Sequence, residues 1–218
     1  MGLRVVVEVA PKRTFASALD WPGWSRGAKT PDDAIESLLA YAPRYARVAK
    51  RAKVSFQPPS TARGVEIVER QTGGGGTEFG VPSSTARAEA EPLPSRELKR
   101  LVALLEASWA AFDAAARTAD GVTLTVGPRG GGRQVPKMIE HVREAESAYV
   151  HQLGTKASGQ SMAELRRSFV EALRWLAAGD ELPAPNKVKR PWTPRYAIRR
   201  SAWHALDHAW EIEDRAPG

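Results

Sequence analysis

The feature that most constrains the fold is a stripe of apolar side chains that repeats at helical spacing through the second half of the chain. Residues 95–117 carry large apolar side chains three and four positions apart, which places them on one face of a helix. The pattern returns in residues 136–153, 161–178 and 192–215. Four such helices, two of them joined by long connections, predict a four-helix bundle. Four tryptophans at helical spacings are expected to be core residues: Trp109, Trp175, Trp203 and Trp210.

The first eighty residues carry a different pattern, because β-branched and alternating residues favour strands. Residues 4–9 and 15–19 predict a hairpin, and residues 65–69 and 77–81 predict two further strands. Between these pairs a helix is expected to begin at Thr30, a good N-cap residue. The chain as a whole is therefore expected to be α+β.

Residues 82–94 separate the two patterns. They are small, polar and interrupted by proline, which is typical of a linker with nothing to bury. The expected division is an α+β domain at 1–81, a linker at 82–94 and an all-α bundle at 95–218. A fragment that starts near Ser95 is then expected to keep its helices, and the linker is expected to be open to proteases.

Composition narrows the function classes. The absence of cysteine excludes disulfides, cysteine-ligated metal sites and an internal thiol nucleophile. No apolar run approaches the roughly 20 residues that a membrane span requires, so we expect a cytoplasmic protein with no membrane partner. The net charge of +7 gathers at residues 44–53 and 187–200. We interpret these stretches as a solvated helix end and a basic loop, which argues against a nucleic-acid partner.

The strongest chemical signal is a histidine pair on the last helix. His204 and His208 stand four residues apart, so both rings lie on one helix face and can close on one ion. His141, beside the apolar stripe of its own helix, is the candidate third ligand. Its rival His151 points about 80° away from it on the same helix. Three imidazoles with one open coordination position predict a site for a divalent metal, with zinc and nickel as the expected ions.

Two charged residues lie on the same face of the last helix as the two histidines. Arg200, one turn before His204, is a candidate for holding an anionic group of a substrate. Glu211 is a candidate either for orienting His208 or for acting as a base. The glycine run at 130–132 lacks the Gly-Lys-Ser/Thr of a phosphate-binding loop, which favours an ordinary flexible loop.

The histidine pattern resembles that of the DinB/YfiT-like superfamily. Its members are four-helix bundles that hold a divalent metal with one histidine on the second helix and a His-x-x-x-His pair on the last. His141, His204 and His208 fall on those positions, and the resemblance covers roughly residues 95–215. It implies a metal-dependent enzyme, such as a transferase or isomerase that uses mycothiol, bacillithiol or glutathione. The implied partners are that small-molecule thiol and an electrophilic substrate, and a homodimer is compatible with this interpretation.

The first part resembles the HicB-like family, in which two strands lead into a Pro-Gly turn, then a glycine, a threonine and a helix. The matching residues are Ala18, Asp20, Pro22, Gly23, Gly27, Thr30, Asp32, Asp33 and Ala34. No ribbon-helix-helix or helix-turn-helix segment follows, which argues against a DNA-binding repressor. The alternative function is therefore a non-enzymatic interaction protein that binds a partner or RNA, with Trp21 and Trp24 as stacking residues and the bundle as scaffold.

Overall fold

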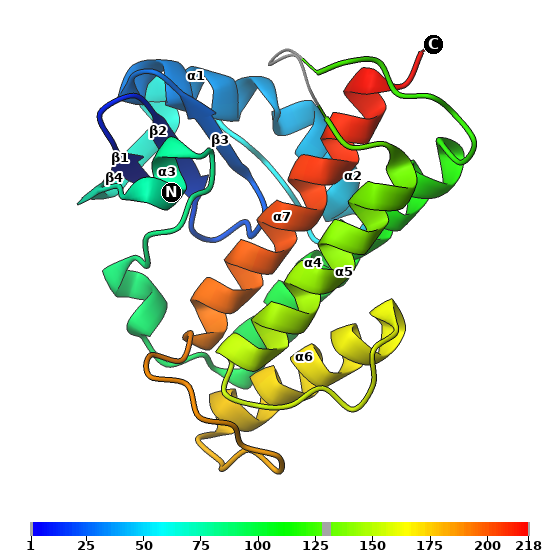
Figure 1. The fold of residues 1–218 in the computed structure, drawn as a ribbon. Coiled ribbons are helices and arrows are strands. Elements are labelled where there is room, and N and C mark those ends of the chain that lie inside the picture. Colours follow the sequence, from blue (N-terminus) through cyan, green and yellow to red (C-terminus); the bar gives the residue numbers. More distant parts are fainter. Residues whose placement is uncertain (1, 128–131, 218) are drawn as a thin grey trace.

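The computed structural model describes residues 2–127 and 132–217, and it shows an α+β chain in which a four-stranded mixed sheet precedes the long helices (Figure 1). The strands are β1 (Leu3–Val9), β2 (Thr14–Ala18), β3 (Ser25–Ala28) and β4 (Val65–Thr72). Their order is β3-β2-β1-β4, with antiparallel pairs except for β4, which runs parallel to β1. The predicted α+β class, the hairpin and the strand at 65–69 are thus confirmed.

Two details of the first part differ from the prediction. Strand β3 was not predicted, because its sequence Ser-Arg-Gly-Ala is short and lacks β-branched residues. The strand predicted at 77–81 is wrong, since a short helix α3 (Gly75–Glu78) occupies its start. The Thr77 hydroxyl accepts a hydrogen bond from the Gly74 N–H at 3.1 Å and donates one to the buried Glu8 carboxylate. These side-chain bonds favour a turn over an extended strand.

Two short helices follow β3 in the chain. Helix α1 (Pro31–Ala40) begins at the predicted Thr30 cap and packs on β2 and β3, and α2 (Ala42–Arg51) packs on α4. Trp24 is fully buried beneath them and donates its indole N–H to the Leu38 carbonyl at 2.8 Å. A buried ring cannot stack on a base, so the expected role of Trp24 in RNA binding is wrong.

The four predicted long helices are all present: α4 (Ser95–Thr118), α5 (Val135–Gln152), α6 (Met162–Ala178) and α7 (Pro194–Arg215). Trp109, Trp203 and Trp210 are buried as predicted, but Trp175 is 42% exposed. Trp175 lies six positions after the buried Phe169, about 240° round the helix and therefore off its apolar stripe. Among the helices of the described residues, none has the length and apolar character that crossing a bilayer demands.

Helix α7 lies between the sheet and α5 (Figure 1) and is buried on nearly all sides. Its Leu206 and Trp210 belong to the core of the sheet unit, while the Phe15 ring meets Trp203 edge-on at 6.2 Å. Gly23 has a φ of 92° and lies so close to α7 that an added Cβ would stand 2.7 Å from Leu206. The sheet unit therefore completes the core around α7, and a fragment that starts at Ser95 would lose this cover.

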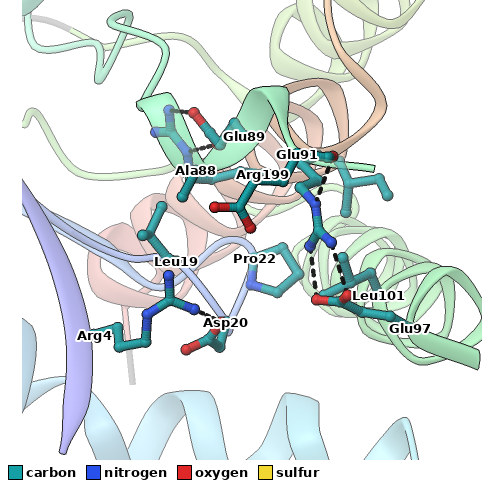
Figure 2. A pocket seen from close by; sticks show the side chains of 12 residues that line it. Arg4, Leu19, Asp20, Pro22, Ala88, Glu89, Glu91, Glu97, Leu101 and Arg199 are labelled. Carbon is teal, nitrogen blue, oxygen red and sulfur yellow. Dashed lines mark hydrogen bonds and ion pairs between the residues drawn. The ribbon is translucent and has the colours of Figure 1, made fainter. Parts of the chain in front are cut away.

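Residues 82–94, predicted as a linker with nothing to bury, are packed. A short 3-10 helix η2 (Arg87–Ala90) places Glu89 against Arg199 of α7, with Nε and Oε1 2.6 Å apart and both side chains 4% exposed. Figure 2 shows this ion pair beside the pocket that it helps to line. Leu93 is buried as well. The segment therefore joins the sheet unit to the helices as an ordered part of the fold.

Candidate metal centre

Three of the four histidines meet where α5 faces α7. His204 and His208 are buried and lie one turn apart on α7, and the half-buried His141 approaches from α5. The Nε2 atom of His204 lies 3.2 Å from Nε2 of His141 and 3.2 Å from Nε2 of His208. The structure thus brings together the three histidines that the sequence singled out, whereas His151 is exposed near the end of α5.

The spacing of these nitrogens fits a single ion. Imidazole nitrogens about 2.0–2.1 Å from a tetrahedral zinc ion stand about 3.3–3.4 Å from one another, and two of the Nε2 separations here are 3.2 Å. All three candidate ligand atoms lie within 4.8 Å of one another. A set of neutral imidazole donors suits zinc and nickel, while calcium and magnesium prefer oxygen ligands.

Glu211 fixes the orientation of His208. Its Oε2 lies 3.0 Å from His208 Nδ1, and its Oε1 accepts a hydrogen bond from Arg215 Nη1 at 2.6 Å. These hydrogen bonds, that of His208 first, lower the pKa of Glu211, so the group is an ionised acceptor. The proton of His208 must therefore sit on Nδ1, which leaves the Nε2 lone pair free for a ligand bond. With both oxygens engaged, Glu211 fits the orienting role better than that of a base.

Burial favours the neutral, ligand-competent form of His204 and His141. It lowers the pKa of His204 well below its ordinary value, and the nearby charges of His208 and Arg200 add to this effect. Burial also lowers the pKa of His141. Metal ions bind only unprotonated imidazole, so these pKa shifts extend metal binding toward lower pH.

Arg200 lies beside the cluster between two aromatic rings. Its guanidinium carbon stands 5.3 Å from the centroid of Tyr149 and 4.7 Å from that of Trp203. Its Nη1 is buried and has no hydrogen-bond partner among the described residues. A buried donor of this kind has capacity for an anionic group. The Tyr149 ring also meets the His204 ring edge-on, with the centroids 5.8 Å apart, so Tyr149 is a neighbour of both Arg200 and the histidine cluster.

Two residues of this site were missed from the sequence. Arg215 is buried, holds Glu211, and donates from Nε to the Thr125 carbonyl at 2.8 Å. Its position four residues after Glu211, on the same helix face, was the signal that could have found it. Tyr149 carried no signal beyond its place in an apolar stripe. Gly130 and Gly131, part of the predicted loop, lie outside the described residues.

Acid is expected to destabilise the metal-free protein through His204. Its pKa is lower in the fold than the value of about 6.5 in an unfolded chain, so unfolding takes up a proton below that pH. The contribution of neutral His204 to the free energy of unfolding is complete above about pH 6.5. It falls by up to about 1.4 kcal/mol per pH unit as the pH drops toward the pKa of His204 in the folded protein. Denaturant titrations in chelator, at about pH 7.5 and about pH 5.5, measure this slope. An equal slope in the His204→Gln variant would contradict the assignment.

No protein-family model, curated protein or solved structure matches this chain. The histidine cluster and its surroundings are therefore the basis for assigning a function to the chain.

Proposed function

We propose that the protein is a metal-dependent enzyme of the DinB/YfiT-like kind that activates a low-molecular-weight thiol for transfer to, or isomerisation of, an electrophilic substrate. The observation that carries the proposal is the convergence of three Nε2 atoms from two helices. The order of the long helices supports it, because His141 lies on the second and the histidine pair on the last. The half-buried His141 leaves the cluster reachable from solvent.

The metal ion, the added thiol and the protein side chains would each have a separate role in the reaction. Three neutral imidazoles leave the double charge of a bound zinc or nickel ion uncompensated, so the ion would lower the pKa of an added thiol. The chain has no cysteine, so the thiol must come from outside, as mycothiol, bacillithiol or glutathione. Arg200 would bind an anionic group of the thiol or the substrate. Glu211 would accept a hydrogen bond from His208 Nδ1–H and so keep the His208 ring oriented.

A spectroscopic titration tests this proposal. Cobalt-substituted protein, titrated separately with mycothiol, bacillithiol and glutathione, is expected to develop a thiolate-to-cobalt charge-transfer band with at least one of them. The Arg200→Ala variant should keep cobalt and give the same band at a thiol concentration at least about tenfold higher, because one charged hydrogen-bond donor is lost. A protein that binds cobalt yet shows no band with any of the three thiols would overturn thiol activation and favour the interaction-protein alternative.

A further inference from the structure

A hollow lies on the face of α7 that points away from the histidine cluster. It has a volume of about 370 Å³, is open to solvent, and is lined by residues of α2, the C-terminal half of α4 and the end of α7. Trp210 and Glu213 line it, two and five positions after His208, so they point about 140–160° away from the histidines. The hollow is therefore separate from the metal centre, and its volume falls in the range of small-molecule sites, about 300–1,000 Å³.

The floor of the hollow is apolar because α4 presents small side chains there. Ala111 and Ala114 line it together with Val122 and Ile212. Larger residues at the alanine positions would fill the space, so their size creates the hollow. An apolar floor favours the body of a ligand that carries few polar groups.

Three arginines of α2 form one side of the hollow. Arg44 is already engaged, since its Nη1 lies 2.8 Å from Asp214 and its Nη2 lies 2.6 Å from Glu213. Arg47 and Arg51 are exposed, line the hollow, and make no ion pair with the described residues. They stand four residues apart, so their guanidinium groups can reach the same anion.

The helix dipole explains a positive charge at only one of these two arginines, Arg51. Arg51 lies in the last turn of α2, where the helix dipole favours a positive charge. Arg47 lies a turn earlier, beside two other arginines, and α2 contains no acidic residue to offset them. Like charges at this spacing destabilise a helix. A bound anion would remove that repulsion.

We propose that this hollow binds a small amphipathic anion, a carboxylate on an aliphatic body. The carboxylate would lie between Arg47 and Arg51, because a guanidinium matches its two oxygens in a bidentate geometry. The aliphatic body would lie on the alanines of α4, near Trp210. A ligand with several charges, such as a nucleotide, would leave polar groups against the apolar floor without partners.

Decanoate, kept below its micelle concentration, is the probe. Calorimetry with the full chain is expected to show one site, and the indole N–H signal of Trp210 should shift in NMR spectra. That signal is assigned from its loss in the Trp210→Phe variant. Decyltrimethylammonium, which has the same body and the opposite charge, should bind at least about tenfold more weakly, because charge complementarity is reversed.

Matched variants distinguish a specific contribution of Arg47 and Arg51 to binding from a general effect of net charge. Arg47→Ala/Arg51→Ala is expected to weaken decanoate binding at least about tenfold. Lys50→Ala/Arg63→Ala also removes two exposed positive charges, but from outside the hollow, and should stay within about twofold of the parent. Ala114→Leu should block the site while circular dichroism and zinc binding remain unchanged. Undiminished binding to the arginine variant, or no Trp210 shift at saturating decanoate, would overturn the proposal.

Discussion

The double variant His204→Ala/His208→Ala is expected to lose stoichiometric binding of zinc and nickel. Both ligands come from one rigid helix, and only His141 would remain near the position where the three Nε2 atoms converge. A structural zinc site with four ligands is worth about 10–16 kcal/mol, so removing two ligands should weaken binding at least about a thousandfold. Metal analysis of tag-free protein and calorimetric titration measure the loss.

The other two histidines provide the comparison for this experiment. His141→Ala should weaken zinc binding at least about tenfold, because the centre loses its only ligand from α5. His151→Ala should bind zinc like the parent, since this exposed side chain lies outside the cluster. Full-strength binding by His141→Ala would show that the ion is held elsewhere.

The second large effect is expected from Glu89→Ala. This change leaves the Arg199 guanidinium buried without its ion-pair partner. Among the described residues, the Ser84 carbonyl at 2.8 Å is then its one remaining hydrogen-bond acceptor. Breaking a buried ion pair from one side costs about 3–5 kcal/mol of the free energy of unfolding. Denaturant titration of parent and variant measures that difference.

Two further variants distinguish the stability cost of an unpaired buried charge from the cost of simply losing an ion pair. Glu97→Ala removes the partner of Arg195, a pair at the more exposed edge of the same pocket (Figure 2), and should cost at most about 1 kcal/mol. Glu89→Leu/Arg199→Met removes both buried charges and should recover most of the stability that Glu89→Ala loses. Equal losses for Glu89→Ala and Glu97→Ala would contradict a buried, structural ion pair.

The helices and the histidine cluster could be predicted because both depend on short-range geometry. A period of 3.6 residues and the caps at Thr30, Ser161 and Thr193 determine where helices lie and begin. The spacing of His204 and His208 is likewise determined by one helical turn. Only the choice of His141 over His151 required an argument about a second helix.

What escaped prediction depends on contacts between distant parts of the chain. The parallel pairing of β4 with β1 leaves no local mark in either strand. Residues 82–94 look like a linker because their composition is small and polar, yet Glu89 is buried by Arg199, which lies 110 positions later. The cover that the sheet unit gives to Leu206 is a contact of the same kind.

X-ray absorption spectroscopy of the zinc-loaded, tag-free protein tests the metal centre most directly. Three imidazole nitrogens at about 2.0–2.1 Å from zinc are expected, with the outer-shell scattering of their rings. In the His141→Ala variant the imidazole count should fall to two. A first shell of oxygen atoms without imidazole scattering, or a spectrum that His141→Ala leaves unchanged, would contradict a metal held by His141, His204 and His208.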